Sequence, residues 1–235
     1  MNPVIALWAH PRSISTAFGR MMMERGDVTV VHEPLVTLVD YGSVPIGEQV
    51  ADSAPAAMAA LRELAAQRPV FVKDTTEYRY QGLFDEPSAM RDIVHTFIVR
   101  EPKQTIASHV HLLPDVTVDK IGYGHLWDLF ELAWQVNRVR PVVVDADRLL
   151  ADPDTMVRKY CAAVGLPHIP EALHWAPEAR PEWERTARWH VDAARSSGFE
   201  ASTKEYAVTV DNDERLRAFY DHHLPYYKKL IRHAI

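Results

Sequence analysis

The residues best suited to chemistry follow the first apolar run of the chain, Val4–Ala9. Arg12 stands shortly after this run, and hydroxyl side chains follow at Ser13, Ser15 and Thr16, where a helical pattern begins. The free N–H groups of a first helical turn and the positive end of the helix dipole bind anions without any side chain. A guanidinium charge and hydroxyl donors strengthen such a site. The pattern predicts a cradle for phosphate or a similar oxyanion.

The same stretch excludes one common kind of nucleotide site. The kinase loop GxxxxGK[ST] needs glycines and a Lys-Ser or Lys-Thr pair, and the sequence from His10 to Phe18 contains neither. The lysine that spans two phosphates and the hydroxyl that holds Mg²⁺ are therefore absent from it. A simpler interpretation also stays open, in which Ser13 only caps the helix and Arg12 lies on the surface.

A second group of polar residues follows another apolar run, His95–Arg100. Arg100 ends this run. Pro102 follows two residues later and suits the first position of a helix, and Ser108 lies about two turns into that helix. A guanidinium fork and a hydroxyl can hold one phosphate together. The alternative is a structural ion pair of Arg100 with Glu101 or Asp74.

These groups need a scaffold that brings several strand ends to one edge. Near-continuous apolar runs predict strands buried on both faces at Val4–Ala9, Val28–Glu33, Val70–Asp74, His95–Arg100 and Val142–Asp145. Helical patterns cover residues 14–25, 55–67, 102–110, 119–139, 153–164, 182–194 and 213–233. This alternation predicts a doubly wound α/β fold with a mostly parallel five-stranded sheet, whose ligands bind beyond the carboxyl ends of the strands. The remaining C-terminal residues are expected to form a helical cover, and residues 1–235 a single domain.

Local signals also predict where helices begin and bend. Asp152 followed by Pro153 should open one helix, and Asp211 or Asn212 should open the last one. Pro225 lies inside that last pattern, where a proline removes a backbone donor and clashes with the preceding turn. We therefore expect the last helix to be kinked or split there.

Composition limits the partners. The 235 residues are 47% apolar and 25% charged, with a net charge of −6 from 26 Lys and Arg against 32 Asp and Glu. No long basic run is present, which argues against a nucleic acid partner. The single cysteine, Cys161, excludes a disulfide framework and suits a reducing cytoplasm. No leader pattern and no apolar run of ~18 residues is found, so no membrane partner is expected. The oligomeric state, a homo-oligomer included, stays open.

Three segments resemble one known family. HPRSISTAF is similar to the 5′-phosphosulfate loop, P-[KR]-S-G-[ST]-[ST], of sulfotransferases that use 3′-phosphoadenosine 5′-phosphosulfate (PAPS), with Ile14 at the glycine position. Arg100 and Ser108, eight residues apart (108 − 100 = 8), match the spacing of the family's 3′-phosphate motif. Residues 142–167 resemble its late strand, its acidic turn and a helix ending in Gly-Leu-Pro. The resemblance spans residues 4–167.

The resemblance implies a bacterial small-molecule sulfotransferase with a P-loop NTPase-like fold. Such an enzyme transfers the sulfuryl group of its co-substrate PAPS to a hydroxyl or amine of a small-molecule acceptor and requires no metal. The donor would be bound by Arg12, Ser13, Ile14, Ser15, Thr16, Arg100 and Ser108. The chain lacks the Arg-Lys-Gly segment of the cytosolic aryl branch, and we hypothesise that Arg195, Ser197 and Gly198, within residues 195–206, take its place.

The resemblance also suggests the base that accepts the proton of the acceptor. Glu33, at the end of the second predicted strand, is our first choice, and His10 and His32 are the alternatives. We expect burial beside an apolar rim to raise the pKa of Glu33. Thr75 stands where the aryl branch has its histidine base.

Two positively charged side chains and the acceptor pocket have further expected roles in catalysis. Arg12 and the loop N–H groups are expected to stabilise the leaving phosphate, and Lys73 to contact the sulfuryl oxygens. The acceptor pocket is expected beside the helix of residues 119–139 and the C-terminal cover.

Two other functions remain open. The run VVVDAD is also typical of a metal-binding strand in P-loop kinases, with Asp145 or Asp147 as the acid, so a phosphotransferase is an alternative. A non-catalytic nucleotide-binding homologue is another, because Ile14 and Thr75 depart from the family pattern. Charge favours sulfuryl transfer, since a sulfuryl group carries less charge than a phosphoryl group and needs less neutralisation by metal.

Overall fold

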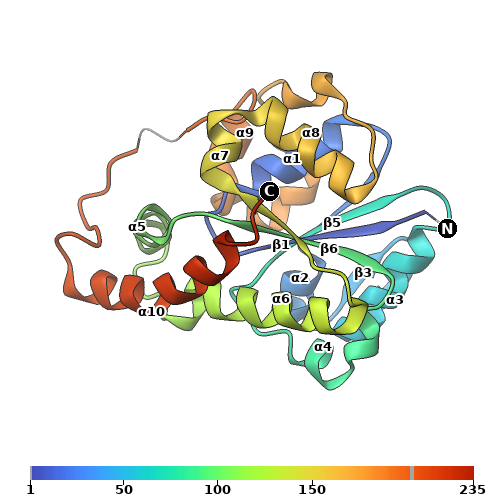
Figure 1. The fold of residues 1–235 in the computed structure, drawn as a ribbon, viewed down its shortest axis with the longest axis horizontal. Helices are drawn as coiled ribbons and strands as arrows, with labels where there is room; N and C mark the ends of the chain where they lie inside the picture. The colour runs from blue at the N-terminus through green and yellow to red at the C-terminus, as the bar shows by residue number, and fades with distance from the viewer. Residues whose placement is uncertain (1, 202–203) are drawn as a thin grey trace.

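The central sheet has five parallel strands in the order β2-β5-β1-β6-β7 (Figure 1). The computed structural model describes residues 2–201 and 204–235. The strands are β1 (Val4–Ala9), β2 (Thr29–His32), β5 (Val70–Thr75), β6 (Ile93–Val99) and β7 (Val142–Asp145). The chain first extends the sheet on one side of β1 and then on the other. The predicted mostly parallel five-stranded α/β sheet is confirmed, and the strand order reverses beside β1, where such sheets bind ligands.

Helices cover both faces of the sheet (Figure 1). The α-helices are α1 (Ser15–Glu24), α2 (Pro34–Tyr41), α3 (Ala54–Leu64), α4 (Gln81–Asp85), α5 (Pro102–Leu112), α6 (Tyr123–Asn137), α7 (Ala146–Ala151), α8 (Pro153–Val164), α9 (Val191–Arg195) and α10 (Glu214–Ile231). Four 3₁₀ segments are η1 (Pro87–Met90), η2 (Asp119–Ile121), η3 (Pro170–Leu173) and η4 (Pro181–Trp189), and a hairpin joins β3 (Val44–Ile46) to β4 (Gln49–Ala51). Helices α1, α7 and α8 lie on one face, and α2, α3 and α6 on the other.

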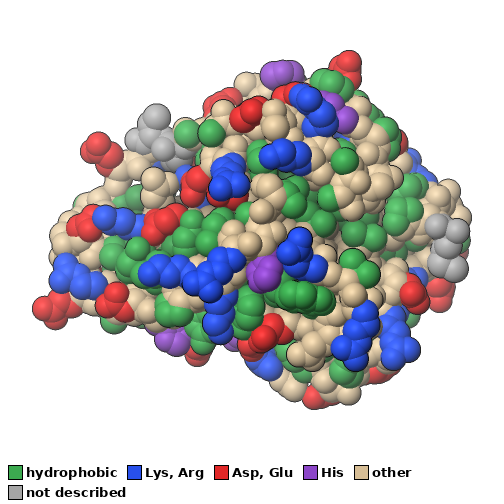
Figure 2. Space-filling view, in the orientation of Figure 1, with side chains coloured by type: hydrophobic (Ala, Val, Ile, Leu, Met, Phe, Trp, Pro, Cys, Tyr) green, Lys and Arg blue, Asp and Glu red, His purple; other side chains and the backbone are tan. Residues whose placement is uncertain are grey.

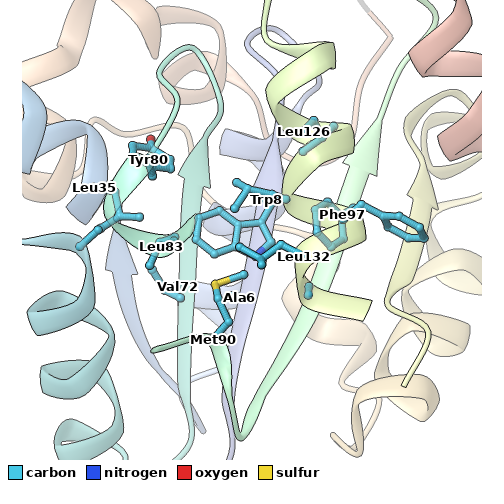
Figure 3. Close-up of a cluster of buried hydrophobic side chains, with 14 of the residues drawn as sticks. Ala6, Trp8, Leu35, Val72, Tyr80, Leu83, Met90, Phe97, Leu126 and Leu132 are labelled. Atoms are coloured by element: carbon cyan, nitrogen blue, oxygen red, sulfur yellow. The ribbon is translucent and has the colours of Figure 1, made fainter. Parts of the chain in front are cut away.

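Alternation along β1 explains why both faces are covered. Ala6 and Trp8 belong to a hydrophobic cluster shared with α3 and α6, whereas Leu7 and Ala9 belong to a cluster shared with α1 and α8. Figure 3 shows Trp8 at the centre of the first cluster. Its indole Nε1 donates a hydrogen bond of 3.0 Å to Nδ1 of His95, which satisfies its buried polar atom. The strands are therefore fixed in position from both sides.

Several boundaries differ from the sequence predictions. The expected helix at 182–194 is wrong over most of its length, because Pro181–Trp189 form 3₁₀ turns and only the last residues join α9. Helix α2 and the hairpin β3–β4 were not predicted. Helix α10 continues through Pro225 and is not split. It is capped by Asp213, whose carboxylate accepts a 2.9 Å hydrogen bond from the N–H of Leu216, and not by either residue before it.

The C-terminal part packs onto the domain. Helix α10 contacts α5 and α6, and the N–H of Ile235 donates a 3.1 Å hydrogen bond to the carbonyl of Val143 in the edge strand. Figure 2 shows acidic and basic side chains interspersed on one face of the molecule. Among the described residues, no helix combines the length and the apolar character needed to cross a bilayer.

Candidate active site

A cavity of about 480 Å³ opens at the carboxyl ends of the strands. Its walls come from the loop after β1, the ends of β2, β5 and β6, the first turns of α5, and residues within 189–201 and 204–206. The sequence-predicted residues that line it are Arg12, Ser13, Ile14, Ser15, Thr16, Glu33, Lys73, Arg100, Ser108, Arg195 and Gly198. The fold thus gathers residues from both ends of the chain at the edge where parallel sheets bind ligands.

The loop after β1 has an unusual backbone. Arg12 and Ile14 have φ angles of 66° and 61°, in the left-handed region. For a β-branched side chain this conformation costs about 1–2 kcal/mol. Ile14 therefore adopts a left-handed conformation that glycine adopts without this cost. It occupies the N-cap position of α1 and provides no side-chain cap for the first N–H groups of that helix.

Ser13 does not act as a helix cap. Its side chain is fully buried, it lines the cavity, and its Oγ has no hydrogen-bond partner among the residues that the structure describes. A buried hydroxyl without a partner is costly. An oxyanion in the cavity would accept both this hydroxyl and the uncapped N–H groups of α1, so the loop has the donor groups of an anion site.

Arg12 connects distant parts of the cavity. Its Nε donates a 2.9 Å hydrogen bond to Oγ of Ser108, and its Nη1 donates one of 3.1 Å to the carbonyl of Trp189. Its Nη2 lies 3.5 Å from a carboxylate oxygen of Asp192. Burial lowers the pKa of Arg12, and the carboxylate of Asp192 opposes this shift. The loop after β1 and Ser108, which the sequence assigns to two ends of one nucleotide, are therefore neighbours.

Arg100 is also held by side chains that a ligand could replace. Its Nε lies 3.2 Å from a carboxylate oxygen of Asp147, and its Nη2 donates a 2.7 Å hydrogen bond to Gln104. The ion-pair partner is thus Asp147, and neither of the two acids considered from the sequence. Because Arg100 lines the same cavity as Arg12, two guanidinium groups meet there in a chain with a net charge of −6.

Glu33 and Lys73 form a buried ion pair. Burial alone would raise the pKa of Glu33, but the charge and hydrogen bond of Lys73, together with the contributions of His32 and His190, outweigh burial, so that the pKa falls to about 2. The expectation of a raised pKa is therefore wrong. The residue beside Lys73, Asp74, shows the expected effect, since burial raises its pKa to about 7. Asp74 accepts hydrogen bonds from the N–H groups of Leu35 (2.6 Å) and Val36 (3.3 Å) and so holds the start of α2.

Two imidazoles lie against Glu33. The Nε2 atoms of His32 and His190 are 3.3 Å apart, and the ring of His190 also contacts Oγ1 of Thr16 through Nδ1, at 3.2 Å. Burial lowers the pKa of His32 to about 4 and that of His190 to about 3, so both rings are neutral at neutral pH. His190 comes from the end of η4, and no sequence pattern linked it to the site.

A family model described as "Sulfotransferase domain" matches residues 3–234. The chain belongs to this sulfotransferase family. The segment that forms the cradle at the end of β1 is also the segment that resembles the donor loop of this family.

Curated relatives of this sulfotransferase chain are longer. The "Branched-chain-amino-acid aminotransferase-like protein 1" of Arabidopsis thaliana is 28% identical over 216 residues, which cover 88% of this chain and 38% of that protein. An "Uncharacterized 32.3 kDa protein in vdh 3'region" of Streptomyces fradiae is 29% identical over 144 residues, covering 59% of this chain and 48% of that protein. The chain spans less than half the length of both relatives.

Solved structures share the fold. The sulfotransferase domain of the Synechococcus PCC 7002 olefin synthase superposes with a TM-score of 0.59 at 17% identity, covering 93% of this chain and 94% of that one. The sulfotransferase domain from the curacin biosynthetic pathway gives a TM-score of 0.52 at 13% identity, covering 94% and 97%. At these identities the likeness concerns the architecture.

His10 has a position that leaves no ring nitrogen for an acceptor. Its Nδ1 donates to the carbonyl of Pro11 at 2.9 Å, and its Nε2 accepts a 3.0 Å hydrogen bond from the N–H of Arg100. The ring is fully buried, stacks on Tyr123 at 3.9 Å between centroids, and does not line the cavity. Burial lowers its pKa to about 3. His10 therefore joins the ends of β1 and β6.

The C-terminal segment only partly follows the sequence hypothesis. Arg195 and Gly198 line the cavity, whereas Ser197 does not and its hydroxyl contacts Glu200 at 3.1 Å. Residues 202 and 203 of this segment lie outside the described residues. None of residues 119–139 lines the cavity, whereas residues of the C-terminal cover do, so only the second of the two expected acceptor walls borders this cavity.

The cavity includes residues that the sequence analysis missed: Glu77, Gln104, Asp192, Lys204 and Tyr206. Glu77 is notable because burial raises its pKa to about 7. Two of the missed residues had a local signal: Glu77 follows closely after β5, and Gln104 stands four residues after Arg100 on α5. Lys204 and Tyr206 lie within the segment 195–206 that the sequence hypothesis named, but Asp192 had no signal, because only the packing of the C-terminal segment brings it to the sheet edge.

Proposed function

We propose that this chain transfers the sulfuryl group of PAPS to a hydroxyl or amine of a small-molecule acceptor. The observation that supports this most directly is that the cradle after β1 and the Arg100–Ser108 pair line one cavity together with Glu33 and Lys73. A donor with two anionic ends and a proton acceptor beside it are the requirements of this reaction. We further propose that residues 1–235 act as one domain in the reducing cytoplasm, on account of the single, buried Cys161.

Donor binding in this proposal is an exchange of anions. The guanidinium groups of Arg12 and Arg100 now contact the carboxylates of Asp192 and Asp147, which are about half exposed. Phosphate oxygens form stronger, bidentate hydrogen bonds with arginine than such partly exposed carboxylates do. The 5′-phosphosulfate would contact the loop of Arg12, and the 3′-phosphate would replace Asp147 beside Arg100.

The chemical step assigns one task to each charged group. The acceptor oxygen or nitrogen forms a bond to sulfur while the bond from sulfur to the bridging phosphate oxygen breaks, and its electron pair leaves with the phosphate. Arg12 and the N–H groups at the start of α1 stabilise this growing negative charge. Lys73 contacts the sulfuryl oxygens, and the carboxylate of Glu33 accepts the acceptor's proton.

The choice of base rests on position. Glu33 adjoins Lys73 and lines both the main cavity and a smaller one of about 160 Å³. Its low pKa keeps it ionised but reduces the drive for proton transfer. Glu77 lines the main cavity and has a pKa of about 7, nearer the optimum for a base at neutral pH. Glu77 is therefore the base to test against Glu33.

The rival phosphotransferase lacks unoccupied acids at β7. The carboxylate of Asp145 caps α7 and accepts hydrogen bonds from the N–H groups of Asp147 (3.0 Å) and Arg148 (3.3 Å). Asp147 itself pairs with Arg100. Both carboxylates thus have structural partners, which favours sulfuryl transfer over a metal-assisted phosphoryl transfer.

Calorimetry with adenosine 3′,5′-bisphosphate tests the donor assignment. We expect binding in chelator that Mg²⁺ does not strengthen, together with sulfation of model alcohols or amines when PAPS is supplied. Binding of ATP that depends on Mg²⁺, with no affinity for the bisphosphate, would instead support the phosphotransferase. Tight bisphosphate binding without transfer to any acceptor in a broad panel would support the non-catalytic homologue.

A further inference from the structure

Three metal-ligating side chains converge beside the cavity from two distant segments. His32 ends β2, Glu33 follows it, and His190 follows η4. The two Nε2 atoms lie 3.3 Å apart, and a carboxylate oxygen of Glu33 lies 3.6 Å from Nε2 of His32 and 4.0 Å from that of His190. We propose that His32, Glu33 and His190 form a binding site for a divalent transition-metal ion of the zinc class.

The distances between the ligand atoms suit such an ion. Zinc binds imidazole nitrogen and carboxylate oxygen at about 2.0–2.2 Å, which places neighbouring atoms of a tetrahedron about 3.4 Å apart. The separation of the two nitrogens, 3.3 Å, already matches this value. The two separations to the carboxylate need to close by a few tenths of an ångström. Two histidines and a glutamate are also an established catalytic zinc set, in which water or substrate takes the fourth position.

The surrounding groups orient the three ligands. The side chains of His32, His190 and Glu33 are only 2%, 4% and 10% exposed, so few other conformations are open to them. Thr16 contacts Nδ1 of His190, the outer-shell arrangement that fixes which ring nitrogen faces a metal. Lys73 holds the second oxygen of Glu33 and leaves the first directed at the imidazoles.

The electrostatic surroundings favour a cation despite Lys73. The charge of Lys73 is balanced by Glu33 within the same ion pair. The smaller cavity next to His32 is lined by three further carboxylates, those of Asp40, Glu182 and Glu184. Their combined negative charge offsets the repulsion from the lysine and offers a route by which a cation reaches the imidazoles.

The metal site is separate from the proposed sulfuryl transfer, which requires no metal. One oxygen of Glu33 cannot accept a proton and bind an ion at the same time. Proton transfer to Glu33 therefore belongs to the metal-free protein, and tests of donor binding and of the base are made in chelator. If the protein binds no metal, the result of the bisphosphate experiment is unaffected. If the protein binds no bisphosphate, the result of the metal titration is likewise unaffected.

Cobalt provides a direct test, because tetrahedral Co²⁺ absorbs visible light. The full chain is stripped with chelator and titrated with Co²⁺, and Zn²⁺ binding is measured by calorimetry. We expect a ligand-field spectrum that saturates at one equivalent and disappears when Zn²⁺ is added. His190→Ala and His32→Ala should weaken Co²⁺ binding by more than the about 10–100-fold typical of losing an outer-shell partner.

Control variants distinguish Co²⁺ binding at the three proposed ligands from Co²⁺ binding at exposed histidines. His222→Ala removes an exposed histidine that lies on α10 and should leave the spectrum and the affinity unchanged. If the alanine variants unfold, His190→Gln and His32→Gln keep most of the volume without the imidazole. No ligand-field spectrum in the parent protein, or an unchanged affinity in folded His190 and His32 variants, would overturn the proposal.

Discussion

The two walls of the cavity are built in different ways. One is the donor loop, residues 10–16, which continues directly from β1 into α1. The other is the C-terminal segment, here residues 181–206, which combines 3₁₀ turns with the short helix α9. The side chain of Arg12 joins them through the carbonyl of Trp189, 177 positions away.

The comparison shows what a local motif can and cannot specify. The donor loop needs only a strand, a tight turn and a helix start, so its anion site follows from adjacent residues. The C-terminal segment contributes Asp192 and His190, and these reach the loop only because the segment packs across the strand ends. In the proposed function the first wall binds the donor, and the second wall supplies groups that compete with the donor or extend its site.

The largest effect should come from the base. Glu33→Gln is expected to reduce turnover by about 10²–10⁴-fold, because an amide cannot accept the acceptor's proton. Bisphosphate affinity, measured by calorimetry in chelator, should stay near that of the parent and shows that the cavity is intact. Full activity in Glu33→Gln, with loss of activity in Glu77→Gln, would transfer the role of base to Glu77.

Arg100→Ala tests the wall encoded by local motifs. Losing a charge-assisted fork to a phosphate should weaken bisphosphate binding by about 100-fold, corresponding to about 3 kcal/mol. The matched control is Arg140→Ala, an exposed arginine that does not line the cavity, and its affinity should not change. Equal affinities in the two variants would remove Arg100 from the donor site.

The pH dependence of kcat/KM distinguishes the two carboxylates. A base works only when deprotonated, so activity falls about tenfold per pH unit below its pKa in the free enzyme. With Glu33 as base, whose pKa is about 2, the acid limb lies below the range in which the protein is assayed. With Glu77, whose pKa is about 7, activity already declines from pH 7 to pH 5. A flat profile between pH 5 and 7 sharpens the case for Glu33.

Asp192→Ala tests the competing role of the C-terminal segment. Asp192 is about half exposed and pairs with Arg12, so its removal should free the guanidinium for the donor. Exposed pairs are worth about 0.2–1 kcal/mol, which corresponds to an up to about fivefold gain in bisphosphate affinity. Glu131→Ala removes the same charge from the exposed side of α6 and serves as control. Weaker donor binding in Asp192→Ala alone would mean that this segment supports the donor site.

Ile14 tests the strain within the donor loop. Ile14→Gly and Ile14→Ala both remove the large apolar side chain, but only glycine adopts a φ of 61° without a steric cost. We therefore expect the glycine variant to be more stable than the alanine variant by about 1 kcal/mol, measured by urea unfolding. Equal stabilities would indicate that the left-handed turn is relaxed in solution.

Much of the fold could be predicted from the sequence because its signals are local. The bounds of β1 and β7 agree with the predictions, since buried parallel strands appear as continuous apolar runs. Helix α2 was missed because it begins directly after the strand end, with Glu33 in the left-handed region and its N–H groups held by Asp74 of a neighbouring strand. The local marks of this helix are Pro34 at its first position and Gly42 at its C-cap.

The ion pair of Glu33 with Lys73 is another feature that the sequence did not predict. The sequence identified Glu33 and Lys73 as separate candidates, and burial alone predicted a raised pKa for the glutamate. Only the parallel pairing of β2 with β5, with His32 opposite Lys73, brings the two charges into contact and reverses the shift. The effect of burial on the pKa of a carboxyl group depends on which charged group lies beside it. The order of the strands decides which group that is.

The sequence by itself indicated the buried strands of a parallel sheet, the anion cradle after β1 and the Arg100–Ser108 pair, because the signal of each lies within a short stretch of the chain. The tertiary structure alone decided that Arg12 contacts Ser108, that His10 is enclosed, and that His190 joins His32 and Glu33. These contacts link segments more than 85 positions apart, as the 90 positions between His10 and Arg100 illustrate. Only burial of the two hydrophobic clusters holds such segments together, and no short pattern in the chain records which side chains then meet.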